Sequence, residues 1–185
     1  MAAASTLTAP PPPGTRTPDL ASMIRVDHAG EFGATRIYAG QLAVLGTASP
    51  AGRAVVHMAA QEAEHHRHFS EMLSQRGIRP TLLHPLWNVA GFALGAATAL
   101  IGPRAAMACT AAVETEIDIH YEQQRQELGG SEPELAATIE RFQAEELEHK
   151  ETAIGHGAEQ QLGYPVMSFL IRAGCRAAIA LSKRI

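Results

Sequence analysis

Two short stretches combine glutamate and histidine at a spacing that suits metal binding. Glu62 and His65 lie three residues apart, and Glu146 and His149 repeat that spacing. Three residues are nearly one helical turn, so on a helix each pair projects from one face. A carboxylate and an imidazole on one face can bind the same metal ion. The pattern therefore predicts two equivalent metal-binding helices.

Each of these pairs is preceded by a further glutamate at almost the same distance. Glu31 lies 31 residues before Glu62, and Glu114 lies 32 residues before Glu146. Both earlier glutamates are followed by a tyrosine at +7 and a glutamine at +10, namely Tyr38 with Gln41 and Tyr121 with Gln124. The repetition predicts a duplicated unit, in which a helix with one glutamate precedes a helix with Glu-x-x-His.

Four such helices would bring four carboxylates and two imidazoles to one centre, the ligand pattern of ferritin-like di-iron and di-manganese bundles. The candidate ligands are Glu31, Glu62, His65, Glu114, Glu146 and His149. Four carboxylates balance two divalent cations, whereas four buried carboxylates without cations would repel one another. A set without thiolates favours Fe(II) or Mn(II) over structural zinc. The alternative is four acidic helix faces exposed to solvent.

The bulk composition is that of a single globular domain. A chain of 185 residues with 46% hydrophobic residues can bury one core. The net charge of −4, with no basic run carrying interleaved aromatic residues, argues against a nucleic-acid partner. Cys109 and Cys175 lie in apolar helical contexts and are expected to be reduced thiols. Residues 1–16 are rich in Ala, Thr and Pro and are interpreted as a disordered tail, which leaves residues 17–185 as the domain.

Proline and glycine mark the ends of the expected helices. Starts are predicted at Thr17-Pro18, Ser49-Pro50 and Pro103, and at a capping box over residues 131–134. Stops are predicted near Gly46, Gly77 and Gly129, and a last helix is expected over residues 166–185. The fold class is therefore all-α, a ferritin-like four-helix bundle built from two helix-pair repeats. An apolar connecting helix and a C-terminal amphipathic helix complete it.

Apolar residues flank the candidate ligands on each expected helix, as a dry metal site requires. On the second helix they form one stripe with the ligands: Val55, Met58, Glu62, His65, Phe69 and Met72. His66 and His68 lie outside these stripes and are expected in solvent or beside the ligands. Glu145, Glu148 and Glu151 also lie outside them and are expected in solvent. Asp118, one turn after Glu114, and His156 are given no role.

Two further segments suggest contact with a membrane. Residues 86–102 contain no charged side chain and reach the lower length limit for a bilayer span. Both repeats must end on the same side to share one centre, so a helix lying in the membrane interface or against a partner is favoured over a span. A core helix is the alternative. The last helix carries Arg172, Arg176 and Lys183 on one side, which is typical of membrane-surface helices, although it could pack on the bundle with its cations in water.

Four stretches of this chain resemble the demethoxyubiquinone hydroxylases of ubiquinone biosynthesis. They are residues 25–40, 85–96, 106–110 and 145–149, and the resemblance extends from about Ser22 to Ile185. It implies that the six candidate ligands hold two iron ions, with O2 as co-substrate and electrons from the quinol or an external donor. His120 and Tyr121 resemble a His-Tyr pair beside the site that relays electrons or protons, although packing alone would also explain Tyr121.

The resemblance also implies the substrate, a polyprenylated demethoxybenzoquinol that is hydroxylated on its ring. Its tail would explain the membrane-seeking segments. A homo-oligomer or a complex with other ubiquinone-biosynthesis proteins is expected. The expected location is the cytoplasmic face of a bacterial inner membrane or, alternatively, the matrix face of the mitochondrial inner membrane. A ferritin- or rubrerythrin-like bundle that oxidises iron or scavenges peroxide could use the same ligands but would not need the apolar segments. A membrane adaptor would not need the ligands.

Overall fold

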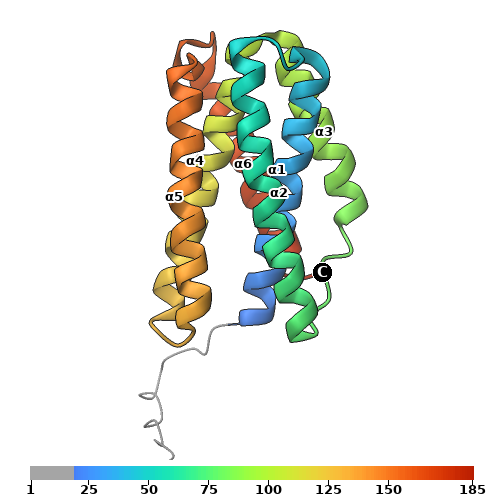
Figure 1. The fold of residues 1–185 in the computed structure, drawn as a ribbon. Coiled ribbons are helices and arrows are strands. Elements are labelled where there is room, and N and C mark those ends of the chain that lie inside the picture. Colours follow the sequence, from blue (N-terminus) through green and yellow to red (C-terminus); the bar gives the residue numbers. More distant parts are fainter. Residues whose placement is uncertain (1–18) are drawn as a thin grey trace, which may run out of the picture.

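The computed structural model describes residues 19–185, and these residues form six α-helices and one short 3₁₀ turn (Figure 1). The predicted all-α class is confirmed. The predicted tail and the start signal at residues 17–18 lie outside the described residues. The helices are α1 (Leu20–Leu45), α2 (Pro50–Arg76), α3 (His84–Ile101), α4 (Pro103–Leu128), α5 (Pro133–Gly155) and α6 (Tyr164–Ser182), with the 3₁₀ turn at Ala158–Gln160.

Most helix ends lie where proline and glycine predicted them. The Ser49 side chain accepts a hydrogen bond from the Gly52 amide at 3.0 Å, and Gly77 and Gly129 end α2 and α4 at φ of 63° and 51°. The predicted capping box at residues 131–134 is wrong, because the Ser131 hydroxyl instead donates to the Leu128 carbonyl at 2.7 Å. Asp19 caps α1 through the Ser22 amide.

Four helices, α1, α2, α4 and α5, form the bundle, in which α1 packs on α2 and α4 packs on α5. The two remaining helices lie outside it, α3 mainly on α1 and α6 mainly on α4 (Figure 1). Each repeat therefore consists of two bundle helices and one outer helix. The apolar segment predicted as a connector is the outer helix of the first repeat, equivalent to α6 in the second.

Apolar side chains fill the bundle on both sides of its charged centre. One cluster includes Phe69, Tyr121 and Phe142, and the other includes Tyr38, Val55 and Met58. The stripe predicted on α2 is buried along its whole length. Closing the bundle above and below in this way excludes water from the centre, which strengthens electrostatic interactions between the groups inside it.

Glycines set the distance between α1 and α3. A Cβ atom added to Gly95 would lie 1.9 Å from the Ile37 carbonyl oxygen, and one added to Gly40 would lie 2.2 Å from the Phe92 carbonyl oxygen. Neither carbonyl can move without distorting its helix. Helices in such close contact gain dispersion energy along their whole length, so α3 is firmly held on α1.

A cluster of three histidines joins α1, α2 and the start of α3. The His28 ring lies 4.6 Å from the His66 ring and 4.9 Å from the His84 ring, measured between centroids. Ser70 and His84 lie within hydrogen-bond distance of the two ring nitrogens of His28. Burial, together with charge repulsion from the neighbouring His66 and His84, lowers the pKa of His28 to about 4. The folded protein therefore holds His28 neutral near pH 7.

We predict that Gly95→Ala destabilises the protein by about 1–3 kcal/mol, the usual cost of overpacking, because its methyl group must displace the α1 backbone. Urea unfolding at constant metal content measures the effect. Gly155→Ala is the matched control, since a Cβ there meets nothing within 4 Å. A Gly95→Ala variant as stable as the control would contradict the close contact of α1 and α3.

His28 predicts a specific pH dependence of stability. In the unfolded chain it titrates near 6.5, so between pH 6.5 and about 4 the unfolded state binds a proton that the folded state excludes. The contribution of neutral His28 to the free energy of unfolding is therefore complete above pH 6.5 and is lost as the pH falls toward 4. The thermal midpoint should therefore fall less steeply between pH 7.5 and 5 in His28→Gln than in the wild type. Exposed His57, changed to Gln, is the control and should keep the wild-type slope.

Candidate metal centre and adjoining cavity

The structure brings the six predicted ligand residues together at the middle of the bundle, and each is at most 2% exposed. They form two overlapping groups in which one oxygen or nitrogen atom of every residue lies within 4.8 Å of the others. The first group is Glu31, Glu62, His65 and Glu146, and the second is Glu62, Glu114, Glu146 and His149. Glu62 and Glu146 belong to both, which is the position of carboxylates that could bridge two cations.

Both histidines turn the same ring nitrogen toward the carboxylates. His65 Nδ1 lies 3.1 Å from Glu146 Oε1 and 3.4 Å from Glu31 Oε2. His149 Nδ1 lies 3.0 Å from Glu146 Oε2 and 3.2 Å from Glu62 Oε1. The two halves of the centre thus have the same arrangement, in agreement with the duplication in the sequence.

The outer nitrogen of each histidine contacts the other repeat. His65 Nε2 lies 2.8 Å from Glu145 Oε2, and His149 Nε2 lies 3.1 Å from Gln61 Oε1. These oxygens can only accept, so each Nε2 carries the proton and Nδ1 is the nitrogen that can donate its lone pair to a metal. The expectation that Glu145 is solvated is wrong. The sequence could have indicated this role, because Glu145 immediately precedes the ligand Glu146, just as Gln61 immediately precedes the ligand Glu62 in the other repeat.

The carboxylates in this centre are poorly satisfied by hydrogen bonds. Among the described residues no hydrogen-bond donor serves either oxygen of Glu62, Oε2 of Glu114 or Oε2 of Glu31. Burial raises the pKa of Glu62 and of Glu114 well above the ordinary value, and the neighbouring carboxylates raise both further. Buried oxygens of this kind are costly unless they meet a cation. The donor set therefore fits a group of positive charge.

Glu146 and His65 are charged even without a cation. Burial alone would raise the pKa of Glu146, but hydrogen bonds from His149 and His65 outweigh it and hold that pKa at about 2. Burial likewise would lower the pKa of His65, yet its hydrogen bond to Glu146 and the negative charges of the nearby Glu31 and Glu146 raise it to about 11. A metal cation at Nδ1 would replace this proton and its charge.

Two tyrosines support the ligands by bonding across the repeats. The Tyr38 hydroxyl of the first repeat donates to Glu114 Oε1 at 2.7 Å, and the Tyr121 hydroxyl of the second donates to Glu31. Burial raises the pKa of both phenols well above 10, so both stay protonated and donate. Each tyrosine thereby orients the ligand glutamate on the first bundle helix of the opposite repeat.

His120 reaches a carboxylate that the sequence analysis missed. His120 Nε2 lies 3.3 Å from Asp27 Oδ1, and the Gln124 amide donates to the same oxygen at 2.7 Å. The only signal for Asp27 was its place one turn before Glu31. Asp118 belongs to neither ligand group and accepts a hydrogen bond from Gln143 at 2.7 Å. His156 is the C-terminal cap of α5.

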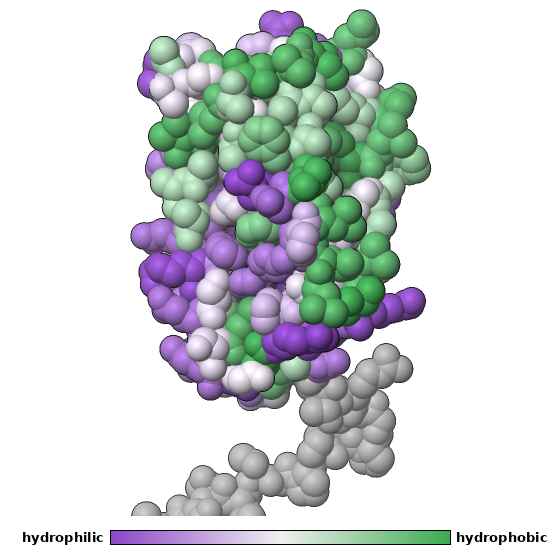
Figure 2. All heavy atoms as spheres, turned by 90° about the vertical axis from the view of Figure 1, so that its right-hand side faces the viewer, coloured by the Kyte–Doolittle hydropathy of each residue, from purple (hydrophilic) through white to green (hydrophobic). Residues whose placement is uncertain are grey.

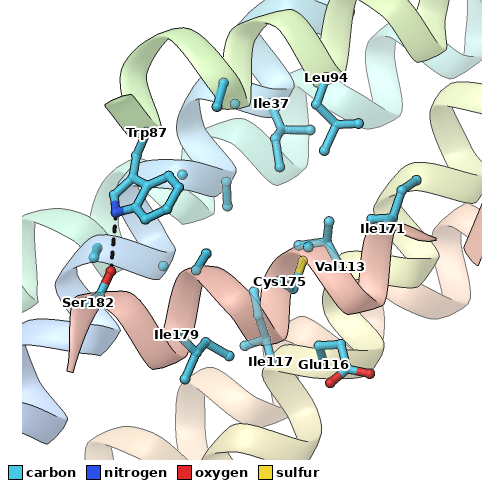
Figure 3. A pocket seen from close by; sticks show the side chains of 18 of the residues that line it. Ile37, Trp87, Leu94, Val113, Glu116, Ile117, Ile171, Cys175, Ile179 and Ser182 are labelled. Atoms are coloured by element: carbon cyan, nitrogen blue, oxygen red, sulfur yellow. Dashed lines mark hydrogen bonds between the residues drawn. The ribbon is translucent and has the colours of Figure 1, made fainter. Parts of the chain in front are cut away.

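A cavity of about 460 Å³ adjoins the centre on the side of the outer helices (Figure 3). Its inner wall is α1 and α4, where Gly30 precedes Glu31 and Val113 precedes Glu114, and its outer wall is α3 and α6. Nearly all of its surface is apolar. The Trp87 indole donates to the Ser182 hydroxyl at 3.2 Å and so joins α3 to α6 at one end (Figure 3). Its volume lies within the usual range for sites that bind small organic molecules.

The basic residues of α6 have a different role from the one expected. Arg172 Nε and Arg176 Nη1 both bond to Glu116 Oε1, at 2.5 and 2.7 Å, and Glu116 is only 4% exposed. These two arginines therefore attach α6 to α4 and do not form a free basic face, which corrects the prediction. Lys183 is exposed.

Exposed apolar residues gather at the end of the bundle where α3 ends and α6 begins. This apolar end consists of Leu100, Ile101, Leu162, Val166, Phe169 and Leu170, each at least 62% exposed. Figure 2 shows apolar residues covering the upper part of the face that carries α3, with polar residues gathered lower down. By length and composition α6 is the one described helix that could cross a bilayer.

Known proteins share this sequence over almost its whole described length. The family model described as Ubiquinone biosynthesis protein COQ7 matches residues 18–182. The 3-demethoxyubiquinol 3-hydroxylase of Rhodospirillum rubrum is 53% identical over 88% of this chain and 76% of its own length. The mitochondrial NADPH-dependent 3-demethoxyubiquinone 3-hydroxylase of Mus musculus is 52% identical, again over 88% and 76%. The mitochondrial 5-demethoxyubiquinone hydroxylase of Saccharomyces cerevisiae is 45% identical over 88% and 77%. The chain belongs to the COQ7 family of ubiquinone-biosynthesis proteins.

Proposed function

We propose that this protein hydroxylates the ring of a polyprenylated demethoxyubiquinol with O2, at a centre of two iron ions held by the six buried ligands. The observation that carries the proposal is the pair of overlapping carboxylate-histidine groups beside an apolar cavity. The relatives are named as hydroxylases of demethoxyubiquinol or demethoxyubiquinone, which supplies the substrate class. A bundle that only stored iron or scavenged peroxide would have no use for an apolar cavity of this size.

Each residue of the centre has a distinct task in this function. Glu31 and His65 would hold one iron, Glu114 and His149 the other, and Glu62 and Glu146 both. When bound, the two ions supply electrons and open coordination positions for activating O2. Tyr38 and Tyr121 orient Glu114 and Glu31, and Glu145 and Gln61 hold the histidines in the metal-binding tautomer. His120, bonded to Asp27, lies beside Tyr121 and is suited to move a proton at its Nε2 atom.

The apolar cavity would hold the substrate. Its walls include α1 and α4, the helices that carry Glu31 and Glu114, so a bound ring would lie beside the centre. The isoprenoid tail would leave the cavity toward the apolar end, which provides the exposed hydrocarbon surface that a lipid tail prefers. The ring then reaches the centre while the tail remains in lipid.

We place the apolar end in the outer layer of a membrane, with the bundle outside it. The expected membrane is a bacterial inner membrane at its cytoplasmic face, or the mitochondrial inner membrane at its matrix face; the mouse and yeast relatives are named mitochondrial. Helix α6 contacts α4 and α1 along the bundle, which supports a surface position for it over a span. Association with a second copy or with other ubiquinone-biosynthesis proteins remains an expectation.

We predict about two irons per chain after purification from iron-supplemented cells, and conversion of a short-tailed demethoxyubiquinol when a reductant and O2 are present. Glu114→Ala and His149→Ala should each lose most of the iron, because the remaining ligands no longer balance two cations. His68→Gln is the control, since His68 belongs to neither ligand group, and it should keep its iron. One zinc ion in tetrahedral coordination would contradict the proposal.

Membrane association should depend on the apolar end. We predict that Phe169→Glu combined with Leu100→Glu abolishes most co-sedimentation with anionic vesicles, because both carboxylates would have to enter hydrocarbon. Leu82→Glu is the control, since Leu82 is 62% exposed and belongs to the segment between α2 and α3, which lies at the opposite end of the bundle (Figure 1). Equal binding by all three proteins would show that another surface meets the membrane. If carbonate extraction failed to release the wild type, α6 would be a span.

A further inference from the structure

The helical glycines of this chain fall into two classes. At Gly40 and Gly95 an added Cβ would collide with the backbone of the facing helix, so close packing requires glycine. At Gly30, Gly33 and Gly174 an added Cβ would meet nothing within 4 Å, although all three line the cavity. Glycine inside a helix is less stable than alanine, and here no neighbouring atom of the protein requires it.

These three glycines lie close to one another across the cavity. Helix α6 runs antiparallel to α1, because Ile171 belongs to the same apolar cluster as Ile37 and the Ser22 hydroxyl reaches the Lys183 carbonyl. That register places Gly174 at the level of Gly33. Gly30 lies one turn earlier on α1 and immediately before the ligand Glu31. The absent side chains therefore widen the cavity at the level of the metal centre.

The single tryptophan of the chain borders the same space. A Cβ atom added to Gly91 would lie 3.0 Å from the Gly33 carbonyl oxygen, and one added to Gly95 would collide with Ile37, so α3 runs parallel to α1 in this region. Trp87, one turn before Gly91, thus lies near the level of Gly30 and lines the cavity with its indole (Figure 3). An aromatic side chain opposite a glycine-lined wall leaves a flat space with apolar faces, which suits an aromatic ring.

We propose that Gly30, Gly33 and Gly174 are specificity-determining residues that keep open a slot for the ring of the quinol substrate, with Trp87 at its border. This proposal rests on the proposed function for the identity of the ring. The remainder of the cavity, toward Ile37, Leu94 and Ile171, takes the first part of the tail. Larger side chains at the three glycines exclude the ring without touching any iron ligand.

Binding can be measured independently of turnover, since a quinone that enters the slot quenches the fluorescence of Trp87. In the iron-loaded full-length protein, a short-tailed ubiquinone analogue should quench this emission with a saturating curve. Gly33→Leu and Gly174→Leu should weaken this binding at least tenfold and lower kcat/KM by a similar factor, with iron content unchanged. Gly155→Leu, a helical glycine outside the cavity with equally open space around it, should bind and turn over as the wild type does.

Measuring thermal stability distinguishes a variant whose slot is filled by the new side chain from a variant whose fold is damaged. Gly30→Ala and Gly33→Ala should each raise the thermal midpoint by about 2–4 °C, because alanine favours the helix and meets no obstruction. The two should bind the analogue more weakly than the wild type in spite of their greater stability. These alanine variants also decide the outcome if the leucine variants fail to fold.

The possible failures are distinguishable. Unchanged quinone affinity in stable, iron-loaded Gly33→Leu and Gly174→Leu would overturn the slot. Wild-type protein that shows no saturable quenching yet hydroxylates the quinol would overturn it as well, and would place the ring elsewhere. Wild-type protein that lacks iron or turnover, but quenches normally and loses quenching in the leucine variants, would refute the proposed function and keep the slot as a ring-binding site.

Discussion

Burial of four carboxylates at the middle of an apolar bundle is the constraint on which this structure depends. Such groups repel one another and are costly to remove from water, so each must meet a compensating charge or a donor. Two histidines, two tyrosines and the proposed pair of cations provide that compensation. Each of these histidines and tyrosines contacts a carboxylate on another helix, and only the pair Glu146 and His149 shares a helix. The same interactions therefore also align the helices with one another.

The duplicated unit explains how this arrangement is specified. Corresponding residues exchange partners between the repeats: Tyr38 bonds to Glu114 while Tyr121 bonds to Glu31. Gln41 and Gln124 show the same exchange. Gln41 bonds to Thr110, four residues before Glu114, and Gln124 bonds to Asp27, four residues before Glu31. The repeats differ where Asp27 and His120 replace neutral groups. That asymmetry gives one side of the centre a chain of titratable groups that the other side lacks.

Local spacing in the sequence was sufficient to identify the bundle, most of the helix ends and the six residues that meet at its centre, because one helical turn determines which side chains share a face. Interactions between distant segments were not accessible in this way. Arg172 and Arg176 were assigned to a membrane surface because nothing local indicates that Glu116 lies opposite them. Glu145 was assigned to solvent because it lies outside the apolar stripe, although the imidazole of the other repeat reaches it. The cavity was also missed, since a glycine in the sequence does not disclose whether its missing side chain would meet backbone or open space.

The two outer helices are attached by different means, and this difference has a mechanical consequence. Interlocked backbones join α3 to α1, whereas α6 is joined to α4 through hydrogen-bonded charges around Glu116 and through side chains of the cavity wall. Where backbones are in contact, even a small displacement of one helix is opposed by strong repulsion. Long arginine side chains, in contrast, can change conformation while they stay bonded to Glu116. The molecule is therefore stiff along the wall formed by α1 and α3 and compliant along the wall formed by α6. Glu31 lies on a helix of the stiff wall, so in the proposed function the geometry at the reacting ring would be kept constant while the opposite wall adjusts to the bulk of the bound lipid.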